Sequence, residues 1–149
     1  MSAAPALRAE TLYSPAVLAL ATQLAACPLI DDLPLLGEAR SPACGSSLRL
    51  GLARDSAGRI SRVGIAARSC AIGQAAAALF AAAAPGMTAD EITRATAAID
   101  AWLAGTGPLP AWPGLETIAA AQGFPGRHGA LRLAWRAALD ALSQGSGPG

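Results

Sequence analysis

Apolar residues recur with a period of two in the middle of the chain. Leucine occupies every second position of residues 48–52, which is typical of a strand with one buried face. Turn chemistry follows at residues 55–58, Asp-Ser-Ala-Gly, and a second alternating stretch covers residues 62–68. These two stretches predict an antiparallel hairpin, and a third, weakly marked strand is expected before Pro42.

The spacing of apolar residues changes to that of helices on either side of the hairpin. Residues 14–26 begin with a Ser-Pro pair, which places a cap before a proline in the first turn, and Pro28 stops the helix. Residues 71–84 are almost entirely apolar and end at a Pro-Gly breaker pair. We expect helices over both ranges, with a loop or short extended piece over residues 29–37.

A third helix and an ordered loop are expected next. Thr88 and Glu91 form a capping box at the start of an apolar stripe that closes at Gly105. Residues 105–114 hold three glycines and three prolines, too many breakers for regular structure. This segment predicts a surface loop that Trp112 anchors.

The remaining segments complete an α+β domain. A short helix over residues 115–121 and a loop over residues 123–129 precede a final helix with one apolar face, formed by Leu131, Trp135, Ala138 and Leu142. We therefore predict a single domain over residues 12–143, a small antiparallel β-sheet of about three strands on which helices pack. Residues 1–11 are expected to be a flexible amino terminus and residues 144–149 a disordered tail.

Composition narrows the range of functions. The net charge is +1 and all eleven cationic residues are arginine, so the totals give no nucleic-acid footprint, and lysine-dependent chemistry is excluded. The longest apolar run, residues 71–84, falls short of the roughly 20 residues that cross a bilayer. No Gly-x-Ser-x-Gly elbow accompanies the single histidine, which disfavours a hydrolase.

Cysteine usage favours a reducing compartment. Three cysteines, Cys27, Cys44 and Cys70, form a sparse and odd-numbered set, unlike the dense frameworks of small secreted domains. Residues 24–27 look like a lipoprotein cleavage box, but charged and polar residues interrupt the apolar core that such a signal needs. We therefore expect a cytoplasmic protein.

Cys44 and Cys70 flank the predicted hairpin. Cys44 comes just before its first strand and Cys70 just after its second, and antiparallel pairing brings these two ends side by side. Cys70 also opens a helix, where free N–H groups and the helix dipole favour the metal-binding thiolate. The geometry alone leaves two interpretations open, a shared metal or cluster site and a pair of small buried hydrophobes.

The motifs just described occur in the same order in a known family. From Leu12 to Leu142 the chain resembles the U-type iron-sulfur cluster assembly scaffolds, the group of IscU, SufU and the amino-terminal domain of NifU. The segments that carry the resemblance are Leu12-Tyr13-Ser14 with Val17, Pro42-Ala43-Cys44-Gly45, Arg68-Ser69-Cys70-Ala71-Ile72, residues 115–122, Phe124-Pro125-Gly126-Arg127 and Leu133-Ala134-Trp135-Arg136-Ala137. The last three are similar to the sulfur-mobilisation subfamily, and the implied fold is SufE/IscU-like.

The resemblance implies a non-enzymatic scaffold or carrier. Such a protein assembles a [2Fe–2S] cluster transiently from iron and from sulfide that a cysteine desulfurase delivers, and passes it to cluster-acceptor proteins. Cys44 and Cys70 would be its thiolate ligands and sulfur acceptors. The chain departs from the family at Ser46, where an aspartate is usual, and at Ala130, where the third cysteine is expected after Gly129.

These departures leave the ligand set open. His128, in the loop that would have presented the missing cysteine, is either a third ligand or a solvated loop residue. A homodimer or an added small thiol would also bring the two cysteines to the four ligands that clusters take. The alternatives are a docking or regulatory partner that has lost cluster binding, and a zinc-binding sulfur acceptor. Cys27 has no counterpart among the family's ligands and is interpreted as a structural thiol.

Overall fold

The computed structural model describes residues 12–30, 32–42 and 45–145. Cys44, the predicted flexible amino terminus and residues 146–149 of the predicted tail lie outside the described residues. The elements, in chain order, are α2 (Pro15–Gln23), η2 (Leu24–Ala26), β1 (Leu35–Ser41), β2 (Ser46–Arg54), β3 (Ile60–Arg68), α3 (Ala71–Ala83), α4 (Ala89–Leu103), η3 (Leu115–Gly123), η4 (Pro125–Arg127), α5 (His128–Leu131) and α6 (Leu133–Gly145). Within these residues no helix has the length and apolar character needed to cross a membrane.

The strands form the predicted hairpin and one further strand. The sheet is antiparallel with the order β1-β2-β3, and Ser47 pairs with Arg68 at the open end of the hairpin. At its closed end the Asp55 carboxylate accepts hydrogen bonds from the backbone N–H groups of Ala57 (2.9 Å) and Arg59 (3.0 Å). Gly58, with φ of 80°, supplies the left-handed turn position that only glycine adopts freely.

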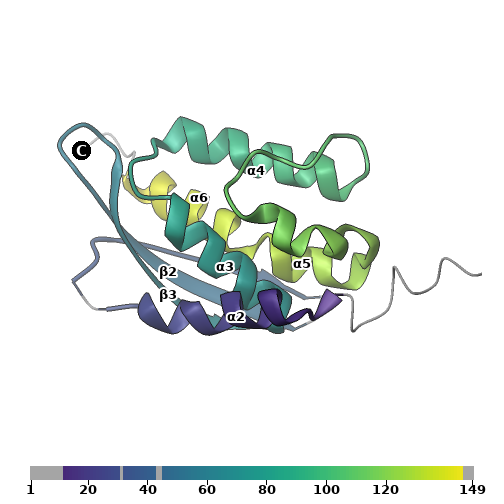
Figure 1. Cartoon of the computed structure of the whole chain (residues 1–149). Coiled ribbons are helices and arrows are strands. Elements are labelled where there is room, and N and C mark those ends of the chain that lie inside the picture. The colour runs from purple at the N-terminus through teal and green to yellow at the C-terminus, as the bar shows by residue number, and fades with distance from the viewer. Residues whose placement is uncertain (1–11, 31, 43–44, 146–149) are drawn as a thin grey trace, which may run out of the picture.

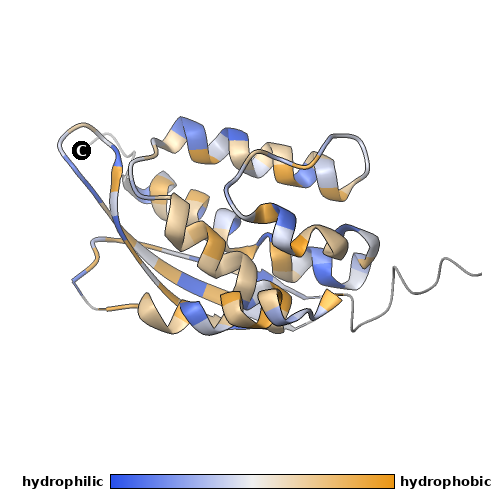
Figure 2. Ribbon diagram, viewed as in Figure 1, coloured by the Kyte–Doolittle hydropathy of each residue, from blue (hydrophilic) through white to orange (hydrophobic). Residues whose placement is uncertain are grey.

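Helices cover one face of the sheet (Figure 1). The helix α6 packs on β1 and β2, α3 packs on β3, and α2 lies against α3. Apolar side chains of β2 alternate toward this face, and α3 is apolar along nearly its whole length (Figure 2). The centre of the core is aromatic, because Phe80 stacks on Trp112 at 5.6 Å and Trp135 meets both rings edge-on.

Local capping chemistry fixes the helix starts where the sequence predicts them. Ser14 Oγ accepts a hydrogen bond from the Val17 N–H at 3.2 Å. Thr88 and Glu91 form the reciprocal capping box at the start of α4. In the loop that follows α4, the Trp112 indole N–H donates to the Leu79 carbonyl at 2.9 Å, which confirms the predicted anchor.

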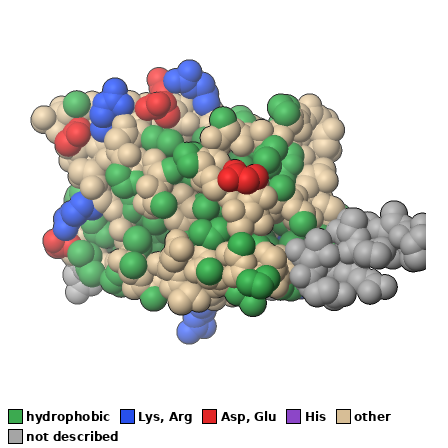
Figure 3. All heavy atoms as spheres, viewed as in Figure 1, with side chains coloured by type: hydrophobic (Ala, Val, Ile, Leu, Met, Phe, Trp, Pro, Cys, Tyr) green, Lys and Arg blue, Asp and Glu red, His purple; other side chains and the backbone are tan. Residues whose placement is uncertain are grey.

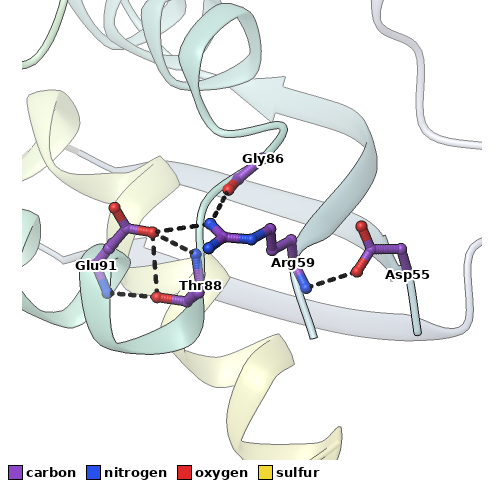
Figure 4. A network of polar contacts seen from close by, with 5 residues as sticks. All are labelled: Asp55, Arg59, Gly86, Thr88 and Glu91. Carbon is purple, nitrogen blue, oxygen red and sulfur yellow. Dashed lines mark hydrogen bonds and ion pairs between the residues drawn. The ribbon is translucent and has the colours of Figure 1, made fainter. Parts of the chain in front are cut away.

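Arg59, at the turn of the hairpin, contacts the residues at the start of α4. Arg59 donates through Nη1 to the Gly86 carbonyl at 2.8 Å and lies 3.6 Å from the Glu91 carboxylate (Figure 4). The same carboxylate accepts from the Thr88 backbone N–H at 3.0 Å. Strand pairing and helix capping are therefore linked at this end of the molecule.

The carboxy-terminal third differs from the sequence-based expectation in two places. The predicted loop at residues 123–129 is mostly helical, because a 3₁₀ turn that opens with Pro125 leads directly into α5. The predicted final helix is interrupted at Arg132, whose φ of −92° and ψ of 2° are non-helical. Its second part, α6, reaches Gly145 and so includes the first two residues of the predicted tail.

Candidate metal and cluster site

Cys70 opens α3, as predicted. It follows β3 directly and adopts an extended N-cap conformation, with φ of −65° and ψ of 172°. Its side chain makes no capping hydrogen bond and is half-buried. The thiol therefore stands at the positive end of the helix dipole, beside N–H groups that a helix start leaves free of intrahelical partners.

The open end of the sheet lies beside this helix start. Ser41 at the end of β1 pairs with Ser46 at the start of β2, and both residues are buried. Arg68, which pairs with Ser47, is two residues before Cys70. The hairpin therefore brings Cys70 close to the stretch that begins with Ser46, and the predicted contact between Cys70 and the undescribed Cys44 stays a prediction.

The helix α5 closes the same end of the molecule. A Cβ built on Gly129 would overlap Ser41 Oγ, so the backbone of α5 sits directly on the end of β1. The neighbouring Ala130 is 1% exposed, and its Cβ lies 3.2 Å from the place that a Cβ on Gly73 would take. The position where the resemblance expects the third cysteine therefore meets the first turn of α3.

His128 begins α5 instead of lying in an open loop. Its Nε2 is 2.8 Å from the Gln122 carbonyl oxygen, and the ring is half-buried. Because a carbonyl oxygen only accepts, Nε2 carries a proton in this contact, which leaves Nδ1 as the nitrogen available to a metal in the neutral ring. The role of His128 as a third ligand stays a prediction.

Within residues 12–30, 32–42 and 45–145, no group of three or more histidine, cysteine, aspartate or glutamate side chains is arranged to hold a metal ion. The described part of the candidate site offers one thiol, that of Cys70, with His128 two residues before Ala130 in the adjoining helix.

Comparison with solved structures decides the fold. The amino-terminal part of a NifU-like protein from Brucella abortus, described as nitrogen-fixing, matches with a TM-score of 0.82 and 23% identity over 91% of this chain and 94% of that one. A protein from Fervidobacterium islandicum, proposed as an iron-sulfur cluster assembly scaffold for the SUF system, matches with a TM-score of 0.80 and 18% identity over 91% of this chain and 99% of that one. The chain has the U-type scaffold fold. No known family profile and no curated protein sequence matches it.

The U-type scaffold fold confirms the predicted α+β class and antiparallel sheet. In this chain Cys27 lies beside the free edge of β3. Cys27 ends η2, packs half-buried against the core, and its carbonyl accepts a hydrogen bond from the Ile65 N–H at 2.8 Å. The backbone at Cys27 thus covers part of the free edge of β3, which is a structural role.

Sequence reasoning missed a hydroxyl in this part of the U-type scaffold fold. Ser69 Oγ is buried and has no hydrogen-bond partner among the described residues. A Cβ on Gly73 would overlap it, so glycine at position 73 is what gives this hydroxyl its room. A buried hydroxyl without a partner costs about 1–3 kcal/mol. The only sequence signal was its place directly before Cys70.

Proposed function

We propose that this chain is a cytoplasmic iron-sulfur cluster assembly scaffold or carrier, and not an enzyme. It binds iron or a [2Fe–2S] cluster transiently, as cargo, through Cys44 and Cys70. A cysteine desulfurase supplies the sulfur and acceptor proteins take the cluster. The observation that carries the proposal is the position of Cys70, which caps α3 where the open end of the hairpin and α5 meet.

The chemistry of this position suits a transient ligand. A helix amino terminus favours the thiolate, which is both the metal-binding and the sulfur-accepting form of cysteine. Clusters usually take four protein ligands, and one chain offers Cys44, Cys70 and, as the proposed third ligand, His128. A homodimer or an added small thiol completes the set. An incomplete set within one chain makes the cluster labile, as transfer to an acceptor requires.

A second candidate function has its own supporting observation. Ala130 is almost fully buried against the first turn of α3, and Ser46 is buried at the start of β2. Apolar or small side chains thus occupy the positions where the resemblance expects cysteine and aspartate ligands. This favours a docking or regulatory protein that keeps the fold without the cluster. A zinc-binding sulfur acceptor is intermediate between the two.

Anaerobic reconstitution with iron and sulfide separates these functions. Purified protein is incubated with iron and sulfide and then desalted. It is assayed for protein-bound iron, acid-labile sulfide and visible absorption. The scaffold function predicts a coloured protein whose iron and colour are lost on Cys44→Ser and on Cys70→Ser. The matched control is Cys27→Ser, which keeps both, because Cys27 lies outside the proposed ligand set.

The opposite results assign the alternatives. Wild-type protein that stays colourless and iron-free supports the docking function. Protein that instead retains zinc, and loses it on Cys44→Ser or Cys70→Ser, supports the zinc-binding sulfur acceptor. Iron that remains on all three serine variants contradicts any role of these thiols in holding it.

A further inference from the structure

The outer face of the sheet, opposite the helices, carries a cluster of three exposed arginines at the open end of the hairpin. They are Arg40 on β1, Arg49 on β2 and Arg68 on β3. Arg40 and Arg68 flank Ser47 in one cross-strand row, and Arg49 lies in the next row of that face. Because neighbouring strands are about 4.8 Å apart, the three side chains start within roughly 10 Å of one another. Figure 3 shows one blue, cationic group projecting from the lower side of the molecule.

These arginines have no carboxylate partner within the part of the chain that the structure describes. The ion pairs found there use other arginines, namely Arg59, Arg62, Arg132 and Arg136. A groove of about 920 Å³ runs over the arginine rows, and among the described residues that line it Glu38 is the only acidic one. The groove is therefore cationic although the whole chain is nearly neutral.

The cationic groove continues into a second groove, which is lined by aliphatic residues and by Asp140. A second groove of about 790 Å³ shares Glu38, Arg49 and Ala66 with the first. It contains Ile30 and Leu36, whose exposed fractions are 45% and 53%. Together the two grooves form one surface with three arginines at one end and exposed aliphatic side chains at the other. We call it the outer-face groove.

The edges of the sheet are partly occupied, so this surface is approached through its side chains. The backbone N–H of Glu38 on β1 donates to the Asp140 carboxylate at 3.0 Å. On the other edge, the Ile65 N–H donates to the Cys27 carbonyl at 2.8 Å. An added strand would have to displace these hydrogen bonds, whereas a segment lying across the face displaces none of them.

We propose that the outer-face groove docks an acidic segment of a partner protein. Its carboxylates pair with Arg40, Arg49 and Arg68, since the guanidinium fork matches a carboxylate, and an aliphatic side chain of the segment packs on Ile30 and Leu36. The apolar end and the near-neutral total charge favour a peptide over a nucleic-acid strand, which needs a longer run of cations.

The groove lies next to the cysteine site without using it. Gly45, which lines the groove, follows Cys44 in the chain, and Arg68 precedes Cys70 by two residues. A docked partner therefore sits beside the place where cargo is proposed to bind. Docking does not require either thiol, so its test is independent of the proposed cluster function.

The test uses the full chain and a fluorescein-labelled peptide rich in glutamate with a central leucine. Fluorescence anisotropy is followed at low and at moderate salt. We expect saturable, salt-sensitive binding that weakens about tenfold when Arg40, Arg49 and Arg68 are all replaced by glutamine, as the loss of three exposed ion pairs implies. Two single variants are compared as a matched pair. Arg49→Gln, in the groove, weakens binding, and Arg94→Gln, on α4, does not. Cys70→Ser keeps peptide binding.

Two further comparisons locate the aliphatic contact and the class of partner. Leu36→Ala weakens binding, while Leu18→Ala, at a similarly exposed leucine on α2, leaves it unchanged. Amide NMR shifts on peptide addition fall on β1, β2 and β3. The proposal is overturned if the peptide does not bind at low salt, if it binds the triple variant as tightly as wild type, or if single-stranded DNA binds the groove more tightly than the peptide.

Discussion

Ala130 packs directly against Gly73, so the first turn of α3 and the short helix α5 touch where the candidate site lies. A Cβ on Gly73 would lie 3.2 Å from Ala130 Cβ and would overlap Ser69 Oγ. We predict that Gly73→Ala destabilises the fold by about 1–3 kcal/mol, the usual cost of overpacking a filled core. Urea unfolding measures it. Gly126→Ala is the control, because nothing lies within 4 Å of the place its Cβ would take.

The same contact gives a way to restore the family's ligand pattern. Ala130→Cys places a thiol where the resemblance expects the third cysteine, and we predict that reconstituted protein then holds its iron several-fold longer against a chelator. Ala130→Ser is the control, since its side chain has a similar size but offers no thiolate. Equal iron loss from the cysteine and serine variants would show that position 130 does not reach the cargo.

Glu91 makes stability depend on pH. Hydrogen bonds from the Thr88 backbone N–H and hydroxyl, with the charge of Arg59 in support, lower the pKa of Glu91 below its ordinary value of 4.5 (Figure 4). Because its pKa is lowered in the folded protein, ionised Glu91 contributes to the free energy of unfolding. This contribution is present above pH 4.5 and is lost as the pH falls through the pKa that Glu91 has in the folded protein. Thermal unfolding measured at a series of pH values below 4.5 should show the melting temperature falling in wild type and falling less in Glu91→Gln.

Two threonines at the start of α4, the N-cap Thr88 and Thr93, provide the control for this pH dependence. Thr88→Ala removes a partner of the Glu91 carboxylate. It should also reduce the fall of the melting temperature at acid pH, the acid limb of the pH profile. Thr93→Ala removes a hydroxyl that bonds only to the Ala89 carbonyl, so it should leave the limb as in wild type. If Thr93→Ala and Thr88→Ala flatten the limb equally, the capping box is not its source.

Trp112 holds the loop between α4 and η3 by ring packing and by a hydrogen bond, which substitution can separate. Trp112→Phe keeps the stack on Phe80 and loses the hydrogen bond to the Leu79 carbonyl, for which we predict a cost of about 1 kcal/mol. Trp112→Ala loses both, for about 3–5 kcal/mol. Leu109→Ala, at an exposed position in the same loop, should cost little. Urea midpoints at a constant m-value measure all three.

The sequence predicts those parts of the fold that local chemistry determines. The hairpin follows from alternating leucines and an Asp-Ser-Ala-Gly turn, and α4 follows from the capping box of Thr88 and Glu91. Each of these signals lies within a few residues of chain. Residues 123–129 contain three glycines and are predicted to be a loop, yet most of them form helical turns. Packing on Ser41 and Gly73, both distant in the sequence, accompanies that conformation.

The sequence likewise predicts only those features of the candidate site that depend on neighbouring residues or on the hairpin. That Cys70 opens a helix could be read from its neighbours, and its nearness to the start of β2 followed from hairpin pairing. The contact between Ala130 and Gly73 and the unpartnered hydroxyl of Ser69 depend on how α5 docks, which no local pattern encodes. The arginine rows of the outer face likewise emerge only from the register of three strands.

X-ray absorption at the iron edge of anaerobically reconstituted protein tests the proposed cargo site most directly, since it reports which atoms surround the iron. The account predicts a sulfur-dominated first shell with a neighbouring iron atom, both diminished in Cys44→Ser and in Cys70→Ser and retained in Cys27→Ser. A shell of oxygen and nitrogen that is the same in wild type and in all three variants would contradict it.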